Sequence, residues 1–131
     1  MTRIELERMS DLNRMITYLE RKKEELFERQ IHITQILSDM PKGNAHYDKL
    51  AEYVAQIEEL DLGFAGVIAE HSELFLRYIR ATAVLKDRER RILRLKYEER
   101  MNWPKIARRM NYSESRCKGI HREALDKIKG F

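Results

Sequence analysis

The side chains best able to do chemistry in this chain are basic, and they gather near its C-terminus. One broad face of a helix would carry Arg116, Lys118 and Arg122 together with Ser115 and Gly119. Guanidinium and ammonium groups bind phosphate, and the fork of Arg116 can also grip two acceptors of a guanine at once. This pattern indicates binding to a polyanion.

The distribution of charge along the chain supports the same interpretation. Residues 86–131 hold 15 lysines and arginines against 7 aspartates and glutamates, whereas residues 1–85 hold 11 against 15. The two parts therefore carry +8 and −4, although the whole chain carries only +4. A segment this basic is attracted to nucleic acids over long distances, and the acidic part is not.

Helix start and stop signals place three short helices in residues 86–131. Asp87 is predicted to cap the first helix, which runs to about Tyr97. Asn102 is predicted to cap the second, which ends at Met110. Short helices of this kind expose one face and bury the other.

The link between the second and third helices has the spacing of a helix-turn-helix. Asn111 follows Ala107 by four residues, at a turn position that requires a positive φ, which asparagine adopts more readily than most residues. Ser113 is predicted to cap the third helix. The buried face of that helix is then formed by Tyr112, Cys117, Ile120, Ala124, Leu125 and Ile128.

In a helix-turn-helix, the second helix of the motif lies in the major groove of DNA and its N-terminal half contacts base edges. The candidates for base contacts are Ser115, Arg116, Lys118, Gly119 and Arg122. The candidates for phosphate contacts, which position the protein without reading sequence, are Arg100, Lys105, Arg108, Arg109 and Ser113. The alternative is a small helical bundle whose basic face only confers solubility.

Residues 1–85 repeat apolar side chains every three or four residues in two long stretches. The first runs from Met9 to Leu37 and the second from Tyr47 to Leu85, with a turn predicted around Pro41, Gly43 and Asn44. Such narrow seams must be buried against another helix. The prediction is an all-α chain, with a coiled-coil-like antiparallel helical hairpin in residues 1–85 and a three-helix helix-turn-helix domain in residues 86–131.

Several residues of the hairpin depart from a simple apolar seam. Lys23, Gln30, Asp61 and His71 occupy seam positions, where polar residues fix the register of helices more often than they form active sites. Gly63 and Gly66 are expected to permit a close helix crossing or a kink. Further apolar residues lie off the seams and need cover from the C-terminal domain or from a second chain: Leu6, Phe27, Ile31, Tyr53, Leu60, Val67 and Leu74. We expect residues 1–85 to serve dimerisation or partner binding, and the protein to be a homodimer.

Other chemistries find no support in the sequence. Cys117, the one cysteine, is expected in the core, and the four histidines are too scattered to bind a metal. No nucleotide-binding loop or nucleophile with a base is present, so we expect no enzyme activity, no cofactor and no small-molecule substrate. No apolar run could span a membrane, and the cytoplasm is the expected location.

Four segments carry a resemblance to a known family: Arg91–Tyr97, Trp103–Ala107, Tyr112–Ser113 and Ala124–Ile128. They resemble region 4 of bacterial sigma factors, the domain that reads the −35 promoter element. That family often has glycine where this chain has Arg100. With its helical N-terminal part, the whole chain is similar to phage regulators of the ArpU and RinA type.

The resemblance implies a transcription activator of phage late genes in a Gram-positive host, with double-stranded DNA as its partner and RNA polymerase as a further candidate. Because no region 2 is present, the chain would act as an activator or adaptor rather than as a complete sigma factor. Two alternatives are a DNA-packaging component similar to a small terminase subunit, and an adaptor that binds the polymerase without binding DNA.

Overall fold

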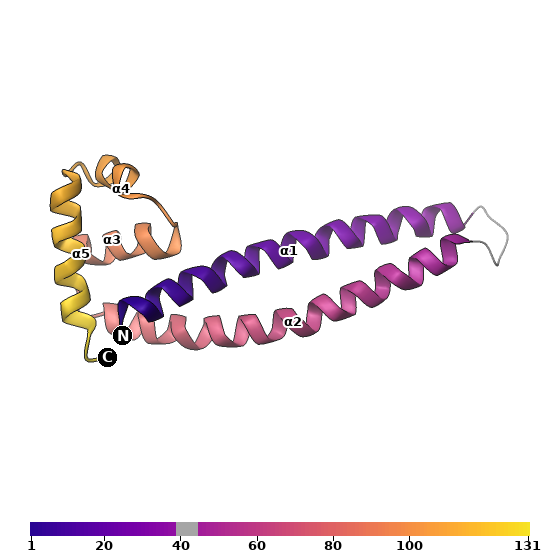
Figure 1. The fold of residues 1–131 in the computed structure, drawn as a ribbon, viewed down its shortest axis with the longest axis horizontal. Helices are drawn as coiled ribbons and strands as arrows, with labels where there is room; N and C mark the ends of the chain where they lie inside the picture. The colour runs from indigo at the N-terminus through magenta and orange to yellow at the C-terminus, as the bar shows by residue number, and fades with distance from the viewer. Residues whose placement is uncertain (39–44) are drawn as a thin grey trace. The chain divides into compact units, whose positions relative to one another are not determined.

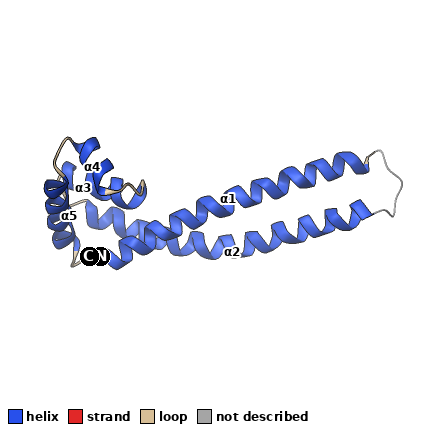
Figure 2. Ribbon diagram, turned by 45° about the horizontal axis from the view of Figure 1, so that its top comes forward, coloured by secondary structure: helices blue, strands red, loops and turns tan. Residues whose placement is uncertain are grey.

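The computed structural model describes residues 1–38 and 45–131, and every regular element in them is a helix. Figures 1 and 2 show the helices in order along the chain. They are α1 (Arg3–Leu37), α2 (Ala45–Thr82), α3 (Asp87–Leu93), the π-helix η1 (Arg94–Glu98), α4 (Trp103–Met110) and α5 (Glu114–Ile128). The predicted all-α fold is confirmed. The turn predicted around Pro41, Gly43 and Asn44 lies outside the described residues.

The chain forms two compact units. One, which we call the composite unit, combines Met1–Asn13 with Glu70–Phe131, and the other, the hairpin unit, is Arg14–Ala69. These units divide the chain differently from the expected ranges 1–85 and 86–131, because both ends of the predicted hairpin pack with the C-terminal helices. The role of residues 1–85 in dimerisation or partner binding stays a prediction.

In the hairpin unit, stretches of α1 and α2 run side by side in opposite directions (Figure 1). Leu26, Ile33 and Ile57 are buried along this contact. Lys23 and Asp61, the polar residues predicted at seam positions, form an ion pair of 2.5 Å between Nζ and Oδ1. An ion pair across two seams fixes their register, at a small net gain in stability because both side chains stay partly in solvent.

The two glycines of the hairpin unit do not mark a close crossing. A Cβ atom added at Gly63 or at Gly66 would meet no atom within 4 Å of it. The expectation that they permit a close helix crossing was therefore wrong for the described residues. Each is expected to cost up to about 1 kcal/mol relative to alanine.

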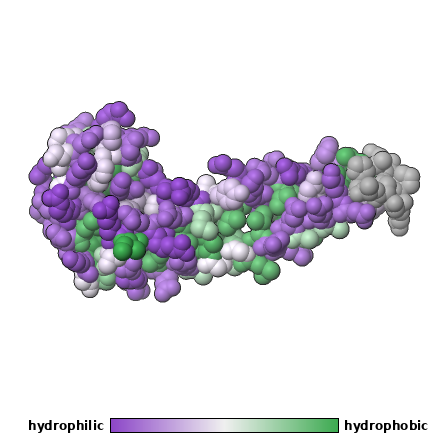
Figure 3. All heavy atoms as spheres, in the orientation of Figure 1, coloured by the Kyte–Doolittle hydropathy of each residue, from purple (hydrophilic) through white to green (hydrophobic). Residues whose placement is uncertain are grey.

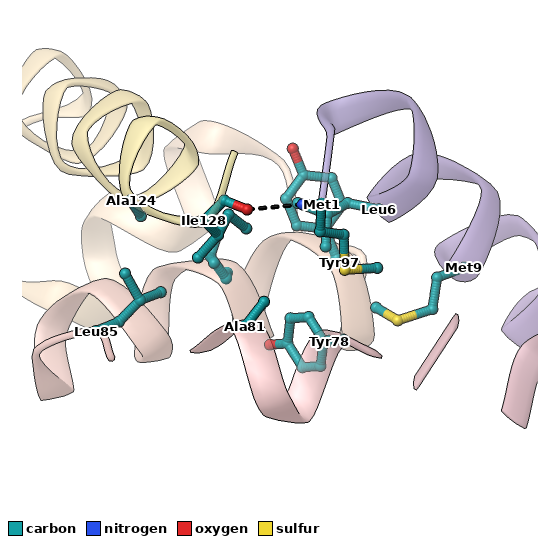
Figure 4. Close-up of a cluster of buried hydrophobic side chains, with 10 residues drawn as sticks. Met1, Leu6, Met9, Tyr78, Ala81, Leu85, Tyr97, Ala124 and Ile128 are labelled. Carbon is teal, nitrogen blue, oxygen red and sulfur yellow. Dashed lines mark hydrogen bonds between the residues drawn. The ribbon is translucent and has the colours of Figure 1, made fainter. Parts of the chain in front are cut away.

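The core of the composite unit joins residues from both ends of the chain, as Figure 4 shows. Met1, Leu6 and Met9 of the N-terminal segment are nearly inaccessible to solvent. They lie in one cluster with Tyr78, Ala81, Leu85, Leu93, Tyr97, Ala124 and Ile128, and Leu74 packs against it. The C-terminal helices therefore cover Leu6 and Leu74, two of the apolar residues that lie off the predicted seams.

Polar contacts tie the same segments together. The Met1 ammonium group donates a hydrogen bond of 2.7 Å to the carbonyl oxygen of Ile128, near the C-terminal end of α5, where helix carbonyls lack partners (Figure 4). Arg8 binds Glu70 through two hydrogen bonds of 2.8 and 2.9 Å. The first turns of α1 thus belong structurally to the C-terminal domain.

Candidate nucleic-acid interface

The helix-turn-helix domain begins with α3, whose N-terminal end differs in detail from the prediction. Lys86 is the N-cap residue and makes no side-chain cap, while Asp87 is already inside the helix and pairs with Arg90. The prediction that Asp87 caps this helix was wrong, because the helix starts one residue earlier than expected. The predicted single helix to Tyr97 also changes character, since its last turn is the π-helix η1.

The second helix and the turn follow the prediction closely. The Asn102 side chain accepts a hydrogen bond of 3.0 Å from the Lys105 amide and so caps α4, which ends at Met110. Asn111 then adopts φ 58° and ψ 37°, the left-handed conformation expected of it. The Tyr112 amide donates to the Ala107 carbonyl oxygen at 3.2 Å, which closes the turn.

The third helix, α5, is capped by the Ser113 hydroxyl, which accepts a hydrogen bond of 3.1 Å from the Arg116 amide. Cys117, Ile120, Ala124 and Ile128 are buried as predicted, and Leu125 is partly buried. Tyr112 is an exception, because 40% of it is exposed. It belongs to the turn rather than to the helix, so the periodicity of α5 does not place it.

A second hydrophobic cluster fixes the angle between α4 and α5. It consists of Ile92, Leu95, Ile106, Met110, Cys117 and Ile120, and Met101, Trp103 and Ala107 pack against it. Because Cys117 lies wholly inside this cluster, burial raises the pKa of its thiol, with a smaller contribution from Glu114. Its environment is that of a core residue and not of a reactive thiolate.

The candidate base-contact residues lie on the outer face of α5. Ser115, Arg116, Lys118 and Arg122 are exposed, and Gly119 between them is partly exposed. On the face drawn in Figure 3, hydrophilic residues cover most of the surface over α3, α4 and α5. No acidic side chain pairs with Arg116, Lys118 or Arg122 among the described residues. Their charge is therefore available to an external anion.

Gly119 is the glycine that matters at this surface. A Cβ atom at this position would meet nothing within 4 Å, so no neighbour in the protein requires a glycine there. Glycine inside a helix costs about 1 kcal/mol relative to alanine. A glycine that the fold does not need leaves room at this face of α5 for the close approach of another molecule.

Of the five candidate phosphate-contact residues, Ser113 is exposed and caps α5, and the other four divide into two groups. Lys105, Arg108 and Arg109 are exposed on α4 and form no ion pair with another described residue. Arg100 instead directs its guanidinium to α1, where Nη1 donates to Ser10 Oγ at 2.7 Å and lies 3.3 Å from Asp11 Oδ1. A phosphate contact by Arg100 would have to compete with these partners, and it stays a prediction.

The backbone at Arg100 has a conformation that favours glycine, the residue that the resemblance implies at this position. Its φ is 54°, a left-handed conformation that costs a residue with a Cβ about 1–2 kcal/mol. In this chain the Arg100 side chain contacts Ser10 and Asp11 of α1. Arg100 therefore acts as a tie between the first turns of α1 and the helix-turn-helix.

A buried polar pair supports α5 from behind. The Tyr97 hydroxyl and His121 Nε2 share a hydrogen bond of 2.7 Å, and Trp103 packs edge-on against His121. Burial, helped by the positive charges of Arg3, Lys96 and Arg122, lowers the pKa of His121 to about 4. Burial also raises the pKa of Tyr97 to about 12. Both side chains are therefore uncharged at neutral pH.

Sequence reasoning missed two buried polar residues of this domain. His121 is 7% exposed and Glu89 is inaccessible, with its Oε1 accepting a hydrogen bond of 2.6 Å from Lys127 Nζ. The signal was present in both cases. His121 lies four residues after Cys117 and directly after Ile120, and Glu89 lies three residues before Ile92. Both positions therefore fall on the buried face of an amphipathic helix.

Comparison with known proteins agrees with this geometry. Residues 81–130 match the family model of sigma-70, region 4. The matched segment begins before α3 and so includes Ala81 and Leu85 of the buried cluster. No curated protein matches the chain, and no solved structure matches it.

The composite unit therefore contains a helix-turn-helix domain similar to sigma-70 region 4. A domain of this kind is a non-catalytic, DNA-binding module of transcription. Among the described residues, no three histidine, cysteine or acidic side chains gather so as to hold a metal ion. None of the described helices is long and apolar enough to cross a membrane.

Proposed function

We propose that this protein is a sequence-specific transcription regulator that binds double-stranded DNA through α5. The observation that carries the proposal is the outer face of α5, where Arg116, Lys118 and Arg122 are exposed, have no acidic partner and flank a glycine that the fold does not need. The match of the surrounding domain to sigma-70, region 4 supports the same function.

Some residues of this surface contact base edges and read the DNA sequence, and others contact phosphates and position the protein. Arg116, in the first turn of α5, donates two hydrogen bonds to O6 and N7 of a guanine, and Ser115, Lys118 and Arg122 contact neighbouring base edges. Gly119 lets the backbone of α5 approach the duplex. Lys105, Arg108, Arg109 and Ser113 bind phosphates and set the orientation of α5. Arg100 reaches a further phosphate by exchanging its contacts with Ser10 and Asp11 for it.

The narrower part of the proposal rests on the resemblance to phage regulators of the ArpU and RinA type. The protein activates phage late genes in the cytoplasm of a bacterial host cell. It binds as a homodimer near the promoter and contacts RNA polymerase there.

The proposal is tested by selecting duplexes from a random library with the full chain and then measuring affinity for the selected and for an unrelated sequence. We expect Arg116→Ala to cost about 1–3 kcal/mol on the selected duplex and to relax the preference at one base pair. Arg108→Ala should weaken both duplexes equally and reduce the slope of log affinity against log salt by about 1.

The matched control is Lys49→Ala, which removes an exposed positive charge from the hairpin unit. It should leave both affinities unchanged. If the selection enriches no sequence, or if Arg116→Ala together with Arg122→Ala binds the selected duplex as tightly as the unaltered protein, the proposal fails.

A further inference from the structure

The last three turns of α2 carry an apolar face that nothing in the described structure covers. Tyr78 and Ala81 face the core of the composite unit, whereas Leu76 and Ile79 on the opposite side are 55% and 49% exposed. Ser72 is exposed one turn before Leu76. These three residues follow each other by four and three positions, which is the spacing of a helix-packing seam.

One edge of this seam carries two unpaired charges of opposite sign. Glu73 and Arg80 are exposed, and neither forms an ion pair or side-chain hydrogen bond with another described residue. They stand seven positions apart, so both lie along the same edge, about two helical turns from each other. That separation is too long for a direct contact within one helix.

This arrangement of apolar and charged residues on α2 is complementary to the same surface of a second, antiparallel copy. A half-turn about an axis perpendicular to α2 near Arg77 places Leu76 opposite Ile79 of a second copy, and Ile79 opposite Leu76. With the same axis, Glu73 lies within about one residue, roughly 1.5 Å along the helix, of the level of Arg80 of the second copy, and Arg80 lies as close to the level of its Glu73. A two-fold interface requires this kind of self-complementary surface.

We propose that the seam of Ser72, Leu76 and Ile79, with Glu73 and Arg80 at its edge, is the interface through which two copies of this chain associate by antiparallel packing of α2. This inference rests on the proposed function in one respect, since that function includes a homodimer as the form that binds DNA. Because few residues take part, the interface belongs to the small class typical of weak association. Binding of both copies to adjacent DNA half-sites raises their effective concentration and strengthens the dimer.

The test uses charge reversal in the full chain and sedimentation velocity over a wide range of protein concentrations. Glu73→Arg places two arginines opposite each other, and Arg80→Glu does the same with two glutamates, so each variant should dimerise at least tenfold more weakly than the unaltered protein. An equimolar mixture of the two variants should form a heterodimer of about the original strength, because each Arg then faces a Glu.

The mixture separates contact between copies from a folding effect, since a variant that merely misfolds is not rescued by another variant. Glu99→Arg, which alters an exposed charge elsewhere in the composite unit, is the matched control and should dimerise like the unaltered protein. An unaltered protein that stays monomeric at every concentration would overturn the inference. So would a dimer that both reversals leave intact, or a mixture that stays monomeric.

These results are independent of the proposed function, because sedimentation needs no DNA. If the protein is a monomer that still binds its selected duplex, the proposed α2 interface is refuted and the proposed regulatory function stands. If it is a dimer that selects no duplex, the proposed interface stands and the proposed regulatory function is refuted.

Discussion

At the scale of single residues, the composite unit depends on polar groups that are kept uncharged inside it. His121, on α5, lies against Tyr97 and Trp103, and the charges that act on it are mainly positive. Protonation would bring a further positive charge into this buried place. The neutral histidine is therefore part of the folded state at physiological pH.

This environment predicts a pH dependence of stability with a definite sign. The pKa of His121 is about 4 when folded and near its ordinary 6.5 when unfolded, so the unfolded chain binds the extra proton between these values. The contribution of His121 is complete above pH 6.5 and is lost as the pH falls toward 4. At pH 5 the loss is on the order of 2 kcal/mol.

Urea unfolding at pH 7.5 and pH 5 checks this, with His121→Gln as the comparison because glutamine can still bond to Tyr97 and does not titrate. We expect the free energy of unfolding to drop more for the unaltered protein than for the variant. Equal drops would mean that His121 is already protonated in the folded protein, or that another group causes the change.

Single residues also show what a sequence can and cannot predict. The caps at Asn102 and Ser113 and the positive φ of Asn111 depend on local backbone chemistry, so they were predictable from the residues alone. The partners of Arg100 were not, because Ser10 and Asp11 are about ninety positions away and no local rule brings them together. The charge of Arg100 suggested a phosphate contact, whereas in the structure its guanidinium contacts Ser10 and Asp11.

At the scale of elements, the orientation of α5 is set by the turn that joins it to α4. The left-handed residue Asn111 and the cap at Ser113 are separated by one residue, so a change in either alters where α5 begins. The core between the two helices then holds their crossing angle. The exposed basic face of α5 is positioned by these three features together.

A substitution at Asn111 should therefore separate backbone strain from other effects. We expect Asn111→Ala to destabilise the protein by roughly 1 kcal/mol, because alanine reaches positive φ at a higher cost than asparagine. Asn111→Gly should be as stable as the unaltered protein or more so. Thermal unfolding of the three proteins measures the order, and an alanine variant as stable as the glycine variant would contradict this account of the turn.

The element that the sequence did not reveal is η1. Its residues, Arg94–Glu98, continue the amphipathic pattern of α3, and nothing in their types distinguishes a π-helix from an α-helix. The π-helix η1 is the last regular element before Arg100, which has a left-handed backbone conformation. Its position also places Tyr97 in contact with both His121 and the buried cluster, which is a tertiary and not a local requirement.

At the scale of the whole molecule, the two compact units carry net charges of opposite sign. The composite unit holds 19 lysines and arginines against 12 aspartates and glutamates, a net charge of +7, and the hairpin unit holds 7 against 10, a net charge of −3. The basic unit thus includes the N-terminal segment, which the sequence assigned to the acidic part. Helix periodicity placed Met9 on a seam and Leu6 off it, and it left open whether the C-terminal domain or a second chain covers Leu6; the structure places both residues in one cluster with Ala124 and Ile128.

This organisation predicts which parts of the chain fold alone. Residues 86–131 by themselves lack Met1, Leu6, Met9, Tyr78 and Ala81, all of them buried in the shared cluster. Deleting one large core side chain typically costs about 2–5 kcal/mol, and a whole domain is stable by only about 5–15 kcal/mol. We therefore expect the fragment 86–131 to show no cooperative unfolding transition.

The complementary variant replaces residues 14–69 by a short glycine and serine linker between Asn13 and Glu70, whose helices are tied there by Arg8 and Glu70. This variant keeps the whole cluster, so it should unfold cooperatively at nearly the temperature of the composite unit in the full chain. Circular dichroism during heating distinguishes the two products. A fragment 86–131 as stable as the linked variant would show that the N-terminal segment contributes little, and a linked variant that fails to fold would show that the hairpin unit is needed to bring α1 and α2 together.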